Sequence, residues 1–368
     1  MHAIDWGKNN NESLGSAYTF CENIAKQKNP FLYYVTGFFE DKNKFKAFCS
    51  TYASMRILDD FVDGIKNRTK LNCDEKIFYL GEINKWEDMI TDCYNGKRFE
   101  NPILRALSDT FKTFNIQLSP WTKLAGAMRW DIEYSRFCTF KEFLNYTEGA
   151  AIAPATVFIS VLAAQSDGNK YDCLVNAADP YIYAKDLAIF CYLTHILRDI
   201  SVDLELEESG LIYLPVEDLH RFSISENDLW NFKSTKSINT NFQQLMEHQI
   251  QRARTFGEAG RASVYKLYNK LDSDCQFILN LLVSLYERTM DKIVKVEYNI
   301  FNGKHKLDNF EILRTTIFNA RALSFGRFRI LLLGLEFIKK NYLKYSTHRH
   351  SFLEKNLKKY QVEKNTII

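Results

Sequence analysis

The apolar stretch from residue 194 to residue 203 carries ionisable side chains at a fixed spacing. His195, Asp199 and Asp203 stand four residues apart. In a helix of about 3.6 residues per turn, this spacing places all three on one face. The apolar residues between them, among them Ile196 and Ile200, can turn into a protein core. The stretch therefore predicts a helix with an acidic stripe beside a buried face.

A second stretch, residues 56–63, repeats this arrangement. Asp59 and Asp63 stand one helical turn apart, and Arg56 lies on the same stripe. Carboxylates on an otherwise apolar helix are costly to bury unless a cation lies between them. We therefore expect the fold to hold the two acidic faces opposite each other, around Mg²⁺ and a diphosphate.

The rest of the chain favours helices. Only 6 Pro and 15 Gly occur among 368 residues, and we find neither an alternating strand pattern nor an internal repeat. Helices are predicted at residues 13–28, from about 31, and at 44–63, 74–95, 102–113, 121–133, 140–146, 150–164, 181–200, 226–232, 240–267, 274–300 and 310–340. Asp41 or Asn43 is predicted to cap the start of the helix at 44–63, and Gly64 to end it. Thr139 and Glu142 are predicted to form a capping box at the start of the helix at 140–146, and Ser223 or Ser225 to cap the helix at 226–232.

Charge and cysteine spacing exclude several classes of protein. The net charge is +3 without a dominant basic block, so we expect no nucleic-acid partner. The eight cysteines form no Cys-x-x-Cys pair, which argues against a zinc site and indicates reduced thiols of a cytoplasmic protein. The 28 Phe and 20 Tyr fill a core or line an apolar cavity.

Two segments bear on membrane contact. The charge-free run 149–166 is interrupted by Pro154, so a buried helix is predicted there rather than a membrane span. Residues 330–335 are apolar and follow Arg327 and Arg329. This segment is either a core helix or a peripheral contact with a membrane surface.

The two acidic stretches suit metal and phosphate chemistry. Mg²⁺ takes oxygen ligands from a few carboxylates, water and substrate phosphates, and arginines add paired contacts to phosphate oxygens. Arg56 and Arg198 stand beside the two acidic stretches. His195, one turn before Asp199, is either a polar site residue or a satisfied core histidine. The sequence contains no Gly-x-Gly-x-x-Gly, no P-loop and no Gly-x-Ser-x-Gly.

At these motifs the chain resembles the squalene/phytoene synthase family of head-to-head prenyl transferases. The resemblance covers roughly residues 31–306 and rests on three segments. They are YASMRILDDFVD at 52–63, LTHILRDISVD followed by GLIYLPVEDL within 193–219, and MRWDIEYSRFCTFKEFLNYTEGAA at 128–151.

The resemblance implies an all-α fold, an isoprenoid-synthase-type helical bundle around a central apolar cavity. Two prenyl diphosphates of 15 or 20 carbons would condense head to head. A cyclopropylcarbinyl diphosphate would form and rearrange to a linear C30 or C40 isoprenoid. Mg²⁺ is the implied cofactor, with NADPH needed only if the product is reduced. The implied division is an N-terminal extension (1–28), a catalytic domain (29–306) and a C-terminal helical extension (307–368).

The resemblance also implies roles for individual residues. Asp59, Asp63, Asp199 and Asp203 would bind Mg²⁺, Arg56 and Arg198 the diphosphate, and Tyr52 and Tyr146 would line the reacting centre, with Asp131 on a matching position. His195 replaces a usual Asn and would contact metal or phosphate, and Tyr192 replaces a usual Gln. Tyr286 fits the substrate-binding pattern, and Lys304 would substitute for a later Arg.

Two other functions stay open. On the same fold, a single prenyl diphosphate can be ionised and cyclised or passed to another acceptor. Alternatively, the chain is a non-catalytic assembly factor, although all four motif aspartates are present. The expected partners are prenyl diphosphates and, for product release, a membrane surface. The chain is expected to be a monomer or a homodimer.

Overall fold

The computed structural model describes residues 2–6, 13–66, 71–168, 170–173, 179–204 and 212–322. The chain divides into two compact units, residues 1–307 and 308–368. The described part of the second unit consists mainly of one helix, α14 (Asn309–Ala322). The fold that positions the predicted site belongs to the first unit.

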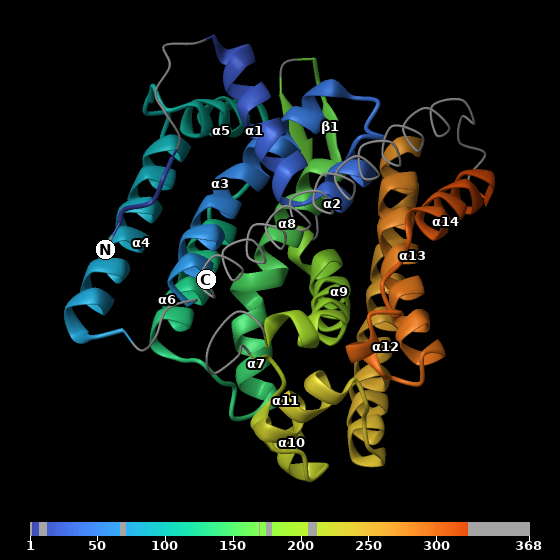
Figure 1. Ribbon diagram of the computed structural model, residues 1–368. Coiled ribbons are helices and arrows are strands. Elements are labelled where there is room, and N and C mark those ends of the chain that lie inside the picture. Colours follow the sequence, from blue (N-terminus) through green and yellow to red (C-terminus); the bar gives the residue numbers. More distant parts are fainter. Residues whose placement is uncertain are drawn as a thin grey trace, which may run out of the picture. The chain divides into compact units, whose positions relative to one another are not determined.

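The described part of the first unit is built almost entirely of helices (Figure 1). In chain order the α-helices are α1 (Leu14–Lys28), α2 (Pro30–Thr36), α3 (Lys42–Lys66), α4 (Cys73–Tyr94), α5 (Pro102–Thr113), α6 (Ser119–Glu133), α7 (Phe140–Thr147), α8 (Ala153–Leu162), α9 (Pro180–Asp203), α10 (Val216–Arg221), α11 (Glu226–Thr235), α12 (Thr240–Leu267) and α13 (Ser273–Lys295). A π-helix (Glu148–Ile152) joins α7 to α8, and short 3₁₀ turns occupy Tyr268–Lys270 and Ile300–Asn302. The predicted all-α class is confirmed.

The structure corrects the prediction in several places. The predicted helix 274–300 ends at Lys295, and the predicted helix 150–164 is divided into a π-helix and α8, which ends at Leu162. A small antiparallel hairpin joins β1 (Ala164–Ser166) to β2 (Tyr171–Cys173), and strands of three residues are too short to give an alternating pattern. Helix α3 does not end at Gly64 but continues to Lys66, because Val62 and Ile65 are buried and their packing outweighs the ~1 kcal/mol cost of a helical glycine. The short helix α10 was not predicted.

The helix caps differ in detail from the predicted ones. Thr139 accepts the predicted bond from the Glu142 amide, but the Glu142 carboxylate accepts from the Cys138 amide (2.7 Å) rather than from Thr139. Ser225, not Ser223, caps α11 with a full capping box. At α3 the Asp41 side chain accepts from the amide two residues later, so Asp41 rather than Asn43 is the capping residue.

Helix α9 runs through the middle of the first unit, with α8, α12 and α13 packed against it (Figure 1). Its most extensive contact is with α12, where two glycines allow the backbones to approach. A Cβ on Gly260 would lie 2.6 Å from the Leu187 amide nitrogen, and one on Gly257 would lie 3.0 Å from the Phe190 ring. The interior position of α9 places its acidic end beside the other helices of the bundle.

A buried lysine ties α3 to α8 and α13. The Lys44 side chain is 2% exposed, and its ammonium group donates to the Leu162 carbonyl (3.2 Å) and to Asp272 (2.8 Å). Leu162 ends α8 and Asp272 precedes α13. These bonds fix the end of α3 that lies away from its acidic motif.

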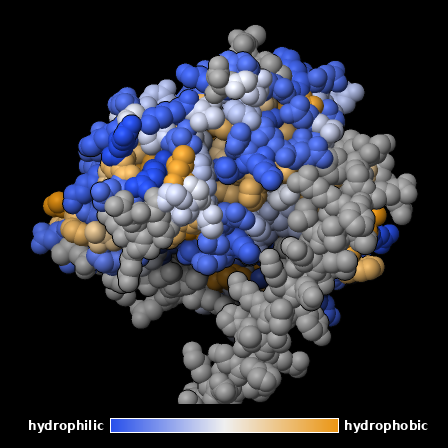
Figure 2. Space-filling model, turned by 90° about the horizontal axis from the view of Figure 1, so that it is seen from above, coloured by the Kyte–Doolittle hydropathy of each residue, from blue (hydrophilic) through white to orange (hydrophobic). Residues whose placement is uncertain are grey.

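The described surface and helices bear on the two membrane predictions. In the view of Figure 2, hydrophilic side chains cover most of the coloured face, and hydrophobic ones form separate patches. None of the helices in the described ranges has the length and apolarity that crossing a membrane requires. The predicted apolar segment 330–335 lies outside the described residues.

Candidate active site

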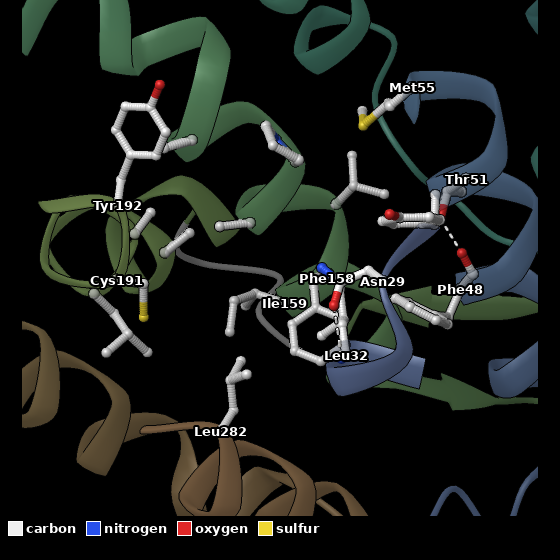
Figure 3. Close-up of a pocket in the computed structure, with 18 of the residues that line it drawn as sticks. Asn29, Leu32, Phe48, Thr51, Met55, Phe158, Ile159, Cys191, Tyr192 and Leu282 are labelled. Atoms are coloured by element: carbon white, nitrogen blue, oxygen red, sulfur yellow. Dashed lines mark hydrogen bonds between the residues drawn. The ribbon is translucent and has the colours of Figure 1, made fainter. Parts of the chain in front are cut away.

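A cavity of about 310 Å³ lies between α2, α3, α8, α9 and α13. Its walls are mainly apolar (Figure 3). Apolar side chains on all five helices contribute to them: Leu32, Phe48, Met55, Phe158, Ile159, Leu187 and Leu282. The predicted central apolar cavity is therefore present, and its volume is within the range of small-molecule sites.

Helix α3 brings three of the predicted residues to this cavity. Tyr52, Arg56 and Asp59 all line it and lie on successive turns. The Arg56 guanidinium donates to Asp59 (2.6 Å) and pairs with Asp60 (2.5 Å). Asp63 lies one turn further along and 4.0 Å from Arg56. This side of the cavity therefore combines an arginine with several carboxylates.

The charges on α3 change the acidity of their neighbours. Burial raises the pKa of the Tyr52 hydroxyl to about 12, although Arg56 alone would lower it. Burial would lower the pKa of Arg56, but Asp59 and Asp60 outweigh it and raise the pKa. Arg56 is therefore a permanent cation, and its Nε is buried without a hydrogen-bond partner among the described residues.

Helix α9 forms the side of the cavity opposite α3. Tyr192 and His195 line the cavity, and His195 Nε2 lies 2.9 Å from Asp199 Oδ2. Arg198 donates to both oxygens of Asp199 (2.9 and 2.5 Å). Burial would raise the pKa of Asp199, but the hydrogen bonds from Arg198 and His195 lower it below its ordinary value. Asp199 is thus an anion held between two donors.

The charges around Tyr213 show that the acidic motifs of α3 and α9 lie near each other. The pKa of its hydroxyl is raised well above the ordinary value, first by burial and then by the charges of Asp131, Asp63, Asp203 and Asp59. One hydroxyl therefore lies within electrostatic reach of aspartates on both α3 and α9. The sequence analysis did not single out Tyr213, although it stands in the quoted segment GLIYLPVEDL.

Tyr146 and Asp131 form a buried pair near the cavity. The Tyr146 hydroxyl donates to Asp131 over 2.9 Å, and its ring lies 6.4 Å from that of Tyr192. Tyr146 is not among the lining residues, and neither are Asp63, Arg198, Asp199 and Asp203. The cavity itself thus contains Tyr52, Arg56, Asp59, Tyr192, His195 and Tyr286 from the predicted set.

The last two predicted residues differ in position. Tyr286 on α13 lines the cavity and makes an edge-to-face contact with Phe31 (6.2 Å). Lys304 is exposed and does not line it. The next residue, His305, is buried and contacts the Arg198 carbonyl over 2.8 Å. Sequence reasoning missed His305, because nothing local distinguishes it from a loop histidine.

The oxygen donors on α3 and α9 suit a hard divalent cation, since Mg²⁺ prefers carboxylates and phosphate oxygens. A tighter group, Asp272, Asp274 and Cys275, occurs elsewhere among the described residues. There Lys44 already pairs with Asp272, and the Glu40 amide donates to Asp274 (2.7 Å). The protein's own donors, Lys44 and the Glu40 amide, already bond to that group.

Comparison with known proteins identifies related sequences. Residues 27–311 match the family model described as squalene/phytoene synthase. The 15-cis-phytoene synthase of Synechocystis sp. is 28% identical over 294 residues, which are 79% of this chain and 81% of that protein. The chloroplastic phytoene synthase 2 of Zea mays is 27% identical over 82% of this chain and 67% of its own length.

Two solved structures share the fold. A dehydrosqualene synthase in complex with ligand has a TM-score of 0.68 at 22% identity, over 85% of this chain and 98% of that chain. Squalene synthase HpnC from Alicyclobacillus acidocaldarius has a TM-score of 0.62 at 19% identity, over 78% of this chain and 96% of that chain. The predicted isoprenoid-synthase-type bundle is confirmed.

Proposed function

The chain belongs to the squalene/phytoene synthase family of prenyl transferases, and we propose that it joins two prenyl diphosphates of 15 or 20 carbons head to head. One observation carries this proposal. Tyr52, Arg56 and Asp59 from α3 and Tyr192 and His195 from α9 line a single apolar cavity. A polar end for diphosphates and an apolar body for hydrocarbon tails are what two such substrates require.

We propose that Asp59, Asp63, Asp199 and Asp203 hold Mg²⁺, with His195 beside them. When bound, Mg²⁺ supplies charge that stabilises the diphosphate leaving group. The Arg56 guanidinium, already ionised and with one buried Nε free of partners among the described residues, adds hydrogen bonds to phosphate oxygens. Arg198 does the same from α9. Together these groups orient the diphosphate at the polar end of the cavity.

The apolar walls then protect the reactive carbons. Ionisation of the first substrate leaves an allylic cation, and the surrounding side chains exclude the water that would quench it. The rings of Tyr52 and Tyr192 can stabilise the cation through their faces. The Tyr146 ring lies beside that of Tyr192 and is held there by the hydrogen bond from its hydroxyl to Asp131. Capture by the second substrate's double bond and loss of one proton would close the ring of a cyclopropylcarbinyl diphosphate. Release of its diphosphate and rearrangement would leave a second cation, which becomes a linear C30 or C40 product by losing a proton or, for a reduced product, by accepting hydride from NADPH.

We place the catalytic region at residues 29–306, with extensions at 1–28 and 307–368. We also propose that an apolar product leaves through peripheral contact with a membrane.

The test is a product assay on the full-length protein with Mg²⁺ and labelled C10, C15 and C20 diphosphates in parallel. A hydrocarbon or diphosphate with twice the substrate's carbon count is the expected product. A cyclised hydrocarbon or alcohol of the substrate's own size would establish single-substrate chemistry instead. Diphosphate release that survives the combined Asp59→Ala and Asp199→Ala substitutions would contradict the assigned site.

A further inference from the structure

The N-terminal extension, residues 1–28, contacts the acidic motif of α3 at both of its ends. Near its start, the His2 ring meets Phe61 edge to face, with centroids 6.0 Å apart. At its end, the ammonium nitrogen of Lys28 lies 2.6 Å from Asp60 Oδ2. Asp60 and Phe61 both belong to the acidic motif. The extension therefore reaches this motif through a ring contact and an ion pair.

Helix α1, which ends at Lys28, is held in place beside α3. It packs against α3 and α5 (Figure 1). Its buried residues recur every four positions, on one face: Ala17, Cys21 and Ala25. The Tyr18 hydroxyl adds a bond of 2.9 Å to Asp109 of α5. Because this face is buried along the helix, the position of Lys28 relative to α3 is fixed.

The Asp60 carboxylate joins two cations. Its Oδ2 accepts from Lys28, and its Oδ1 lies 2.5 Å from Arg56 Nη2. Arg56 also donates from Nη1 to Asp59 over 2.6 Å. Arg56 and Asp59 line the cavity, whereas Lys28 and Asp60 do not. Asp60 therefore links a lysine outside the cavity lining to the arginine within it.

The ion pair with Lys28 decides how strongly Asp60 acts on its surroundings. Three carboxylates, those of Asp59, Asp60 and Asp63, lie within 4.0 Å of Arg56. Without Lys28, the charge of Asp60 would be unshared. It would then attract Arg56 more strongly and draw the guanidinium away from phosphate oxygens. It would also attract Mg²⁺, which prefers carboxylate oxygens.

We propose that Lys28 is a positioning residue, which neutralises Asp60 and thereby leaves Arg56 available to the diphosphate. Lys28 acts through Asp60 and does not itself touch the substrate. This inference rests on the proposed function, because it presumes that Arg56 binds a diphosphate. It gives the N-terminal extension a part in substrate binding, and it makes Asp60 a bridge between cations rather than a metal ligand.

The first experiment measures diphosphate release by the full-length protein, with Mg²⁺ and whichever of the C15 and C20 diphosphates reacts faster. Lys28→Met removes the charge but keeps a long aliphatic side chain. It should raise KM about two- to fivefold, the factor that a partly exposed ion pair supplies, and change kcat less. It should also lower the Mg²⁺ concentration at half-saturation, because Asp60 loses a competing cation. A merely structural defect would not move these two quantities in opposite directions.

Two further variants test whether Lys28 acts through Asp60. Lys28→Arg restores the charge and should return KM to near the wild-type value. In an Asp60→Asn background the carboxylate is already neutral, so adding Lys28→Met should change neither KM nor the Mg²⁺ dependence. If Lys28→Met raises KM equally in both backgrounds, Lys28 contacts the substrate directly and the inference is wrong.

A matched control removes a similar ion pair away from the cavity. The Lys97 ammonium lies 2.6 Å from Asp92, both side chains are exposed, and neither residue lines the cavity. Lys97→Met therefore loses an equally short pair at the surface. It should leave KM, kcat and the Mg²⁺ dependence unchanged.

The outcomes separate this inference from the proposed function. Turnover with a KM that Lys28→Met does not move, or that Lys28→Arg does not restore, overturns the inference alone. A chain that releases no diphosphate from any prenyl substrate overturns the proposed function. Calorimetric binding of inorganic diphosphate with Mg²⁺ then decides on the inference, since affinity must fall in Lys28→Met and must not fall further when Lys28→Met is added to Asp60→Asn. A wild type that binds no diphosphate overturns both.

Discussion

The imidazole of His305 donates a hydrogen bond from Nε2 to the main-chain carbonyl of Arg198 over 2.8 Å. A carbonyl can only accept, so Nε2 carries the proton. His305 is 1% exposed, and its other nitrogen has no hydrogen-bond partner among the described residues. Because Arg198 directly precedes Asp199, this bond fixes α9 at its acidic motif from a loop 107 residues away.

This contact predicts a positioning role that a conservative substitution can rescue. His305→Leu removes the donor and should lower the free energy of unfolding by about 1–3 kcal/mol. It should lower kcat for diphosphate release more than it raises KM, since Arg198 and Asp199 then lose their fixed position. His305→Gln retains an N–H donor and should recover much of kcat. Equal kcat in the two variants, measured with thermal unfolding as a folding control, would contradict this role.

Local signals allowed much of the helical frame to be predicted. Helices α5 and α12 have the predicted boundaries, residues 102–113 and 240–267, because Asn101 and Asn239 cap them through side-chain bonds and their apolar residues recur at helical spacing. The lining residues Tyr52, Arg56 and Asp59 follow from the same spacing. A periodic pattern fixes which residues share a face before any tertiary contact is known.

Long-range packing explains what sequence reasoning missed. Lys304 follows Gly303, whose φ is 74°, and its side chain is exposed, so its contact with phosphate stays a prediction. Its neighbour His305 is the buried residue. The pKa of Tyr213 is likewise raised in part by aspartates on α3, α6 and α9. No local pattern encodes such contacts.

The close approach of α12 to α9 predicts that Gly260→Ala destabilises the protein. The new Cβ would lie 2.6 Å from the Leu187 amide nitrogen, and such overpacking costs about 1–3 kcal/mol. Leu187 also lines the cavity, so kcat/KM should fall with stability. Gly126→Ala is the matched control, because its Cβ would meet nothing within 4 Å and should stabilise α6 by about 0.5–1 kcal/mol. Denaturant unfolding measures both, and equal stabilities would contradict the predicted clash.

His195 offers a test of the polar end of the cavity. Its side chain is 50% exposed and bonds to Asp199, so His195→Asn, which keeps a polar amide, should retain diphosphate release. His195→Leu should slow release roughly tenfold or more, because a hydrogen bond to a charged group contributes about 1.5–3 kcal/mol. The exposed His220 on α10 provides the control, and His220→Leu should leave the rate unchanged. Equal rates for the two His195 variants would make it a packing residue.

Asp218 predicts how stability depends on pH. Both of its oxygens accept from Arg252 (2.5 and 3.1 Å), and Gln249 donates to one of them (2.8 Å). Burial would raise the pKa of Asp218, but the bonds from Arg252 and Gln249 outweigh it and lower the pKa below the ordinary value of 3.8. The folded protein therefore binds this proton less readily than the unfolded chain does.

It follows that Asp218 stabilises the fold above the ordinary carboxyl pKa, and that this stabilisation is lost as the pH falls through the lowered folded value. Asp218→Asn should reduce the free energy of unfolding by about 1.5–3 kcal/mol at pH 7, and the difference from wild type should shrink below about pH 4. Asp291→Asn removes an exposed partner of Arg254 (3.5 Å) and should change stability by about 0–1 kcal/mol at every pH. Denaturant unfolding from pH 2.5 to 7 measures both variants. A deficit in Asp218→Asn that stays constant over this range would show that the charge of Asp218 is not what stabilises the contact between α10 and α12.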